Sequence, residues 1–336
     1  MPAENSASTD RSWLRRFVIW PSEAAVLAVL FSFFAVLPRR VASWVGGVVT
    51  AFLGPLVSRQ HVRAIRRNLA IAFPELTARE SAALQHKIWR HLGRVLSNHS
   101  HLPPLLRRPG FDGVIEIEGA EHLVEAARSG PFLIVGAHFG HLELTGCHAA
   151  LTGHRISGLY TPEGNPWVDR LIRQLRGRAS TESELIARGP TAVRQMIECL
   201  RRGHGLFMVV DQRVDDGEWL SFFGQPAQTT TAPARLARRF DCPILLGRAI
   251  LLPKGRYRIS YYKPLRPDPA READADIFAM TQAINDTFEA WIREHPEQWL
   301  CTKRRWPKYW RASNVQSRQP AAEDESTRAR IPAKVD

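Results

Sequence analysis

PFLIVGAHFGHLE, residues 131–143, is the stretch that decides the fold, because it changes from an apolar run to a polar turn and then to a helical pattern. Residues 131–136 are a short apolar run bounded by Gly130 and the turn, which is typical of a buried strand. The helical pattern occupies residues 142–151. A strand, a turn and a helix in this order predict one unit of an α/β sheet.

The same alternation of strands and helices continues along the chain. Further strand candidates are residues 114–117, 156–160, 206–210, 244–252 and 257–262. Helical patterns lie between them, at residues 122–128, 167–175, 192–201, 234–240 and 277–293. We therefore expect an α/β fold with a mostly parallel or mixed central sheet that is flanked by helices on both faces.

The composition favours an anionic partner. Lys and Arg number 46 against 33 Asp and Glu, so the formal net charge is +13. Such an excess favours contact with nucleic acid, a phospholipid surface, a phosphorylated substrate or an acidic carrier protein. The four cysteines are far apart and lack zinc-type spacing, which indicates reduced, mostly buried thiols.

The N-terminal region predicts a membrane anchor. Arginines precede an apolar stretch at residues 17–37, Pro38-Arg39-Arg40 follows it, and residues 41–57 carry no charge. A helix of about 20 apolar residues is needed to cross a bilayer core. A cleaved signal peptide is disfavoured because no small-residue cleavage site follows Leu37. We expect an uncleaved N-terminal membrane-anchoring helix that either spans the bilayer or lies in its interface, with a buried core helix as the alternative.

The expected domain organisation has four parts. Residues 1–12 are a flexible N-terminus, residues 13–60 the membrane anchor segment, and residues 61–311 one catalytic domain without an internal composition break. Residues 312–336 are polar and charged with scattered prolines, which indicates a disordered tail.

His138 and Glu143 are the first candidates for chemistry. Ligands of open α/β sheets bind outside the carboxyl ends of the strands, and His138 follows such an end. A strand-to-helix bend can bring the Glu143 carboxylate behind the His138 ring, and an imidazole held by a carboxylate is a competent general base near neutral pH. A histidine in a turn, with a glutamate favoured by the helix dipole, explains the same pattern without catalysis.

Several motifs in one order resemble the lipid A biosynthesis (lauroyl/myristoyl) acyltransferase family, within the glycerolipid acyltransferases that carry an H-x4-D/E motif. The resemblance covers most of residues 20–310. It is carried by HFGHLE at residues 138–143, RNLAIAFPE at 67–75, GAEHL at 119–123, NPWVD at 165–169, DQ at 211–212, FFGQPAQTTTAPA at 222–234, PEQWL at 296–300 and RRW at 304–306. The C-terminal motif departs from the family pattern, since Cys301-Thr-Lys303 replaces its Trp-x-His.

The resemblance implies a glycerolipid-acyltransferase-like fold and an O-acyltransferase that uses His138 as the general base and Glu143 as its orienting partner. It places Arg176 closest to the arginine that steadies the oxyanion, with Arg173 and Arg178 near in register. Backbone N–H groups near Gly140 are the alternative oxyanion donors.

Three further residues are assigned to the substrate. We expect Asp211 and Gln212, at a strand end, to position it. Thr230, in a threonine run before a helix, is expected to bind a phosphate through the helix N-terminus, with plain N-capping as the alternative.

The predicted reaction moves a fatty acyl chain from acyl carrier protein or acyl-CoA to a hydroxyl of a lipid A precursor or related phosphorylated glycolipid at the bacterial inner membrane, with the catalytic domain on the cytoplasmic side. It forms no acyl-enzyme and needs no metal or other cofactor. The alternatives are a lysophospholipid or phosphatidylinositol-mannoside acyltransferase and, more remotely, a metal-dependent hydrolase that uses His138, His141 and Glu143. We expect no nucleic-acid partner, since no DNA- or RNA-binding motif is present.

Overall fold

A computed structural model describes residues 13–101, 113–179 and 183–307, with the side chains of 176–179 and 183 left out. The predicted flexible N-terminus and disordered tail lie outside these residues. The N-terminal third is helical. It comprises the π-helical turn η1 (Arg15–Ile19), α2 (Trp20–Val36), α3 (Arg39–Val57), α4 (Arg59–Ala72), α5 (Ala78–Asn98) and the 3-10 turn η2 (His99–His101).

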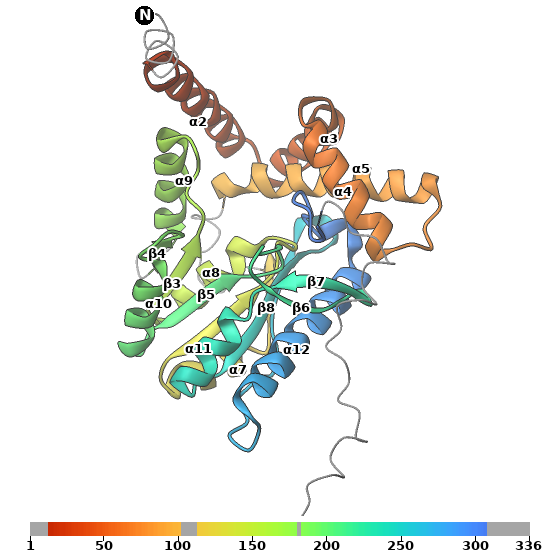
Figure 1. Cartoon of the computed structure of the whole chain (residues 1–336). Coiled ribbons are helices and arrows are strands. Elements are labelled where there is room, and N and C mark those ends of the chain that lie inside the picture. Colours follow the sequence, from red (N-terminus) through yellow and green to blue (C-terminus); the bar gives the residue numbers. More distant parts are fainter. Residues whose placement is uncertain (1–12, 102–112, 180–182, 308–336) are drawn as a thin grey trace, which may run out of the picture.

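A seven-stranded sheet forms the centre of the remaining chain, in the order β1-β9-β8-β2-β5-β3-β4 (Figure 1). Neighbouring strands run parallel except β8 and β9, which are antiparallel. The predicted α/β class with a mostly parallel sheet is confirmed. The strands are β1 (Ile115–Glu118), β2 (Phe132–Gly136), β3 (Ile156–Tyr160), β4 (Ser183–Ala187), β5 (Gly205–Val209), β8 (Ile244–Leu251) and β9 (Tyr257–Tyr261).

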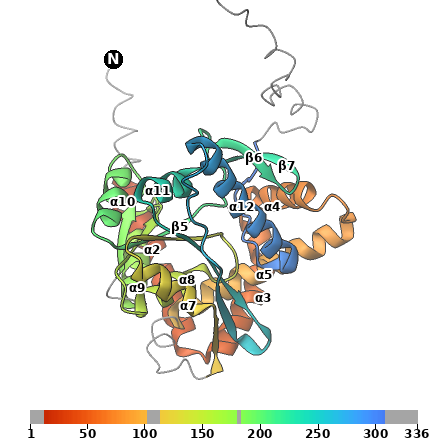
Figure 2. The ribbon, with the colours of Figure 1, turned by 90° about the horizontal axis from the view of Figure 1, so that it is seen from below.

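Helices cover both faces of the sheet, with α10, α11 and α12 on one face and α7 and α8 on the other (Figure 2). Alternate residues of a strand point to opposite faces. Leu133 and Val135 of β2 accordingly join one core cluster, whereas Phe132 and Ile134 join the other. The helices are α7 (Ala120–Arg128), α8 (Leu142–Leu151), α9 (Pro166–Ala179), α10 (Ala192–Arg201), α11 (Ala232–Phe240) and α12 (Ala273–Glu294); η4 (Pro253–Gly255) and η5 (Pro296–Gln298) are 3-10 turns.

Three strands were missed by the sequence analysis. β4 is an edge strand and pairs with β3 alone in the sheet. β6 (Glu218–Phe222) and β7 (Gln225–Thr229) form a separate antiparallel hairpin. Its two strands, EWLSF and QPAQT, mix polar and apolar residues, so neither is the apolar run by which the other strands were recognised.

α3 packs closely against α5 because small residues face each other at the crossing. Gly46 and Gly47 of α3 are buried there. At Gly93 of α5, an added Cβ would lie 2.1 Å from the carbonyl oxygen of Gly46 and 2.6 Å from Cβ of Thr50. The opposite side of α3 leaves large apolar side chains exposed: Trp44, Phe52, Leu53, Leu56 and Val57.

Two helical segments, Arg15–Val36 and Arg39–Val57, are long and apolar enough to cross a membrane. α2 packs against α9 (Figure 1). The side-chain amide of Asn165, just before α9, donates hydrogen bonds to the carbonyl oxygen of Trp20 at 2.9 Å and to the carboxylate of Glu23 at 2.9 Å. The first apolar helix is therefore fastened at its N-terminal end to the residue that precedes α9.

We expect Gly93→Ala to destabilise the protein. The gain in helix propensity is about 1 kcal/mol. Overpacking costs about 1–3 kcal/mol, and the obstructing atom is a backbone oxygen that cannot rotate away. Thermal and denaturant unfolding of the purified protein measure the difference. Gly189→Ala is the control, since an added Cβ at Gly189 meets nothing within 4 Å. Equal stability of the Gly93 variant and the wild type would contradict the tight crossing.

Candidate active site

The turn after β2 brings His138 to the carboxyl edge of the sheet. Gly140 adopts φ +58°, and an added Cβ there would lie 1.9 Å from the carbonyl oxygen of Ala249, so this position requires glycine. The backbone N–H of His141 donates to the same carbonyl oxygen at 2.7 Å. The turn is thereby fixed on β8 before α8 begins at Leu142.

His138 is held on both ring nitrogens by the residues that follow the neighbouring strand, β5. Its Nδ1 lies 2.6 Å from Oδ1 of Asp211, which also accepts the backbone N–H of His138 at 3.0 Å. The side-chain amide nitrogen of Gln212 lies 3.1 Å from Nε2. A carboxylate accepts and an amide nitrogen donates, so this pattern places the ring proton on Nδ1 and the lone pair on Nε2.

Asp211 is buried, with a side-chain exposure of 3% against 32% for His138. Burial alone raises the pKa of Asp211. The opposing charge of His138, the hydrogen bonds from its ring and backbone, and the indole N–H of Trp299 at 3.4 Å lower it, and the net result is a pKa below the ordinary value. Asp211 is therefore ionised at neutral pH, as a partner that stabilises an imidazolium must be.

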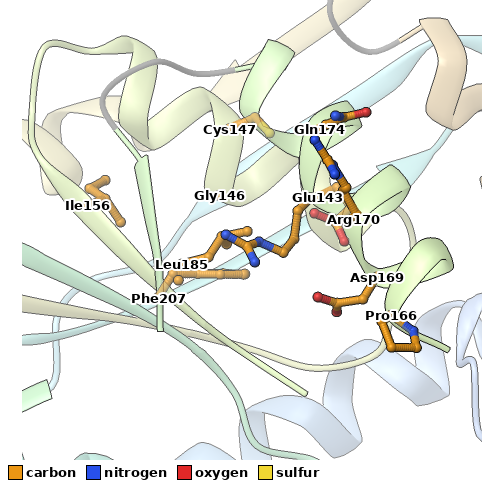
Figure 3. Close-up of a pocket in the computed structure, with 12 residues that line it drawn as sticks. Glu143, Gly146, Cys147, Ile156, Pro166, Asp169, Arg170, Gln174, Leu185 and Phe207 are labelled. Atoms are coloured by element: carbon orange, nitrogen blue, oxygen red, sulfur yellow. The ribbon is translucent and has the colours of Figure 1, made fainter. Parts of the chain in front are cut away.

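Two adjoining cavities meet beside this pair. The first, of about 270 Å³, contains His138, Glu143 and Gln212, and its lining includes the cationic side chains of Arg188 and Lys303. The second, of about 710 Å³, is shown in Figure 3. The two share Glu143, Gly158, Leu185 and Phe207. The rest of the second cavity is lined by Gly146, Cys147, Ile156, Pro166, Asp169, Arg170, Arg173 and Gln174, from α8, β3 and the region of α9.

Comparison with known proteins identifies the family. The model of the bacterial lipid A biosynthesis acyltransferases matches residues 6–308. The chain belongs to this family. It is 26% identical over 304 residues to the lipid A biosynthesis lauroyltransferase of Escherichia coli K12, covering 88% of this chain and 90% of that protein. It is 25% identical over 284 residues to the palmitoleoyltransferase of the same organism, covering 80% and 86%.

Among solved structures, the chain matches the 1-acyl-sn-glycerophosphate acyltransferase PlsC of Thermotoga maritima. The match covers 75% of this chain and all of that one, at 15% identity and a TM-score of 0.33.

The carboxylate on Nδ1 of His138 is Asp211, where the sequence analysis expected Glu143. The physical reason is the strand order. β5 lies beside β2, and Gly136 pairs with Val209, so the residues just beyond the two strand ends meet. Glu143 is the second residue of α8 and lines both cavities. Asp211 and Gln212 contact the histidine directly, and the catalytic and substrate roles predicted for these residues stay predictions.

The predicted backbone oxyanion donor is not available in this structure. The N–H of Gly140 donates to the carbonyl oxygen of Gln298 at 2.9 Å, and the N–H groups of His138, Phe139 and His141 donate to Asp211, Ala137 and Ala249. Gly140 shapes the turn, and its predicted part in binding the oxyanion stays a prediction.

Thr230 lies one residue before Thr231, the N-cap of α11, and among the described residues no side chain caps this helix. The hydroxyl of Thr230 accepts the backbone N–H of Ala232 at 3.3 Å. Thr230 is not among the described residues that line the cavity of His138. Its predicted phosphate-binding role stays a prediction.

The three candidate arginines belong to α9. Arg173 lines the larger cavity. The side chains of Arg176 and Arg178 lie outside the described residues, so their predicted roles stay predictions.

The metal-hydrolase alternative finds no support in the described residues, which contain no group of three or more His, Cys, Asp or Glu able to hold a metal ion. His141 is fully buried, its ring stacks with His99 at 5.9 Å, and it packs edge-on against Tyr257. Burial, followed by the nearby His99, lowers the pKa of His141 to about 3. His141 is therefore neutral at neutral pH, and its ring packs between His99 and Tyr257.

The sequence analysis missed Trp299 and Lys303 as site residues. Trp299 donates to Asp211, and Lys303 lines the cavity of His138. Both lie near the C-terminal motifs, from which the sequence analysis inferred the family resemblance but no site residue.

We expect Asp211→Asn to lower kcat by about 10²–10⁴-fold, the usual contribution of general acid–base catalysis, because an amide cannot stabilise the imidazolium. Steady-state kinetics of acyl transfer measure this loss, and circular dichroism checks folding. Asp215→Asn is the matched control, since the Asp215 side chain is 81% exposed. Near-wild-type kcat in a folded Asp211 variant would refute the pairing.

Proposed function

We propose that this protein transfers a fatty acyl chain from a thioester, on acyl carrier protein or coenzyme A, to a hydroxyl of a lipid A precursor or a related phosphorylated glycolipid. The observation that carries the proposal is the orientation of His138. Its Nδ1 faces a buried carboxylate, and its ring lines a cavity that adjoins a larger one. Membership in the lipid A acyltransferase family supports the acyl-transfer reaction.

The proposed step is direct. The acceptor hydroxyl takes the place of Gln212 at Nε2 of His138. Nε2 removes its proton as the oxygen attacks the thioester carbonyl, and the charge of Asp211 stabilises the resulting imidazolium. When the tetrahedral intermediate collapses, the carbon–sulfur bond breaks and the imidazolium returns the proton to the departing thiolate. The products are an ester and a free thiol.

Glu143 acts on the substrate side of this arrangement. It lies where the two cavities join, so its carboxylate is placed to accept a hydrogen bond from the acceptor. Arg188 and Lys303 line the same cavity as His138 and suit a phosphate of either substrate. The oxyanion would be stabilised by a cation from α9, for which Arg176 remains the predicted residue.

The larger cavity is the proposed site of the acyl chain. Its volume of about 710 Å³ lies in the range of ligand pockets, roughly 300–1,000 Å³. Ile156, Leu185, Phe207 and Cys147 give it apolar walls, and it joins the His138 cavity. An acyl chain bound there would leave its thioester carbonyl near the histidine.

The N-terminal helices are the proposed attachment to the bacterial inner membrane, with the catalytic domain on the cytoplasmic side. α2 exposes apolar side chains that include Val26, Val29, Phe33 and Val36. α3 exposes its apolar face opposite α5. Exposed apolar surface of this extent on neighbouring helices is typical of a membrane-facing region.

The proposal is tested with the purified full chain in detergent. We expect mass spectrometry to show a lipid A precursor heavier by one acyl chain, with an acyl-carrier-protein or acyl-CoA donor. His138→Ala should lower the rate by at least about 10²-fold. Acylation of a lysophospholipid in place of the glycolipid would establish the alternative acceptor, and transfer to neither would refute the function.

Chain-length preference tests the acyl cavity. Cys147 lines the larger cavity and not that of His138. We expect Cys147→Phe to fill part of the cavity and lower kcat/KM for long donors relative to short ones by about tenfold or more. Cys147→Ser, of similar size, is the control and should keep the wild-type preference. An unchanged preference in the Phe variant would place the acyl chain elsewhere.

A further inference from the structure

The C-terminal segment of the described chain, residues 298–306, contains a buried cation behind the active site. Arg305 is 1% exposed. Its guanidinium donates to the carbonyl oxygen of Gln228 at 2.7 Å and to the hydroxyl of Thr229 at 2.6 Å, and it lies 4.8 Å from the centre of the Phe222 ring. These groups are neutral. A buried guanidinium is costly to desolvate, so its position calls for a reason.

The same segment is attached directly to the catalytic turn. The N–H of Leu300 donates to the carbonyl oxygen of His138 at 2.7 Å, and the carbonyl oxygen of Gln298 accepts from Gly140. Trp299 pairs with Phe139 as an isolated β-bridge. Figure 1 shows this blue end of the ribbon between α5 and the sheet. The backbone position of His138 therefore depends on residues about 160 positions later in the sequence.

Aromatic contacts connect Arg305 to Asp211. The Trp299 ring lies 6.2 Å from that of Phe222, which carries the guanidinium on its face. The indole N–H of Trp299 points to the second carboxylate oxygen of Asp211, the one that does not bond to His138.

Asn68 of α4 fixes the segment from the other side. Its amide nitrogen donates to the carbonyl oxygens of Cys301 at 3.0 Å and Lys303 at 2.8 Å, and its amide oxygen accepts the backbone N–H of Arg305 at 3.0 Å. Three hydrogen bonds from one buried side chain thus hold the backbone of this segment, one of them at Arg305 itself.

The electrostatics agree with this geometry. Burial lowers the pKa of Arg305 to about 10 and Asp211 raises it, so the guanidinium is charged at neutral pH and senses that carboxylate. The charge and hydrogen bonds of His138 lower the pKa of Asp211, and the Asp211 charge in turn raises the pKa of both Cys301 and Arg305. Burial raises the pKa of the Cys301 thiol, which is thus neutral at neutral pH. Arg305 is then the permanent cation behind the carboxylate.

We propose that Arg305 is a positioning residue of the acyltransferase: its buried charge adds to the contacts of His138 and Trp299 that keep Asp211 ionised and, through Trp299 and the attached turn, keeps His138 ready to accept a proton. This rests on the proposed function, since the proton acceptance belongs to acyl transfer. Arg305 touches no reacting atom.

The test is the pH dependence of kcat for Arg305→Gln, Arg305→Lys and the neighbouring, exposed Arg304→Gln. Loss of a nearby positive charge makes the His138–Asp211 pair hold its proton to higher pH. We expect the acid limb of the Arg305→Gln profile to move up by about one pH unit, with a roughly tenfold loss of activity on that limb. KM should change little. The Lys variant should restore the limb, and Arg304→Gln should leave it in place.

A fall in kcat without movement of the limb, or a folded Lys variant that behaves as the Gln variant does, would reduce Arg305 to a packing role. If Arg305→Gln fails to fold, Arg305→Met takes its place, because it removes the charge and keeps an unbranched side chain of similar length; an unmoved limb there also refutes the proposal. Failure of the proposed function is distinguishable, since it appears as a wild-type protein without acyl transfer.

Discussion

The contact between His138 and Asp211 is the constraint on which the site depends. It exists because β2 and β5 are parallel neighbours and end at the same level, with Gly136 beside Val209. Two further features support this contact. The turn at Gly140 fixes the histidine backbone on β8, and the indole N–H of Trp299 donates to the second carboxylate oxygen of Asp211. An ionised aspartate away from water is expensive unless its oxygens are occupied, and here both are.

Much of the fold was predictable from the sequence. Six of the seven strands of the sheet were recognised, because a strand that is buried on both faces is a run of apolar residues bounded by turn residues. The edge strand β4 and the hairpin of β6 and β7 were not, since these strands mix polar and apolar residues and form no unbroken apolar run. The buried positions of the hairpin alternate along each of its strands. Phe223, in the turn between the strands, adopts φ +54°, a conformation that its residue type does not indicate.

The sequence predicted four residues of the site, but not which of them contact each other, and it did not indicate Trp299 or Lys303. His138, Glu143, Asp211 and Gln212 were all singled out, as polar residues at or just beyond strand ends. Sequence spacing favoured the nearer carboxylate as the partner of His138. The choice of Asp211 follows from strand order, which places β5 and not α8 behind the ring. The rule that ends of adjacent parallel strands meet would have found it, had β5 been known to neighbour β2.

The hydrogen bonds of Asn165 to Trp20 and Glu23 have a geometric consequence. α9 forms one wall of the larger cavity, and the same helix carries the apolar helix α2 on its outer side. With α2 in a bilayer, as proposed, a tilt of this helix would move that wall, and bilayer thickness, which sets such tilt, would then affect the width of the cavity.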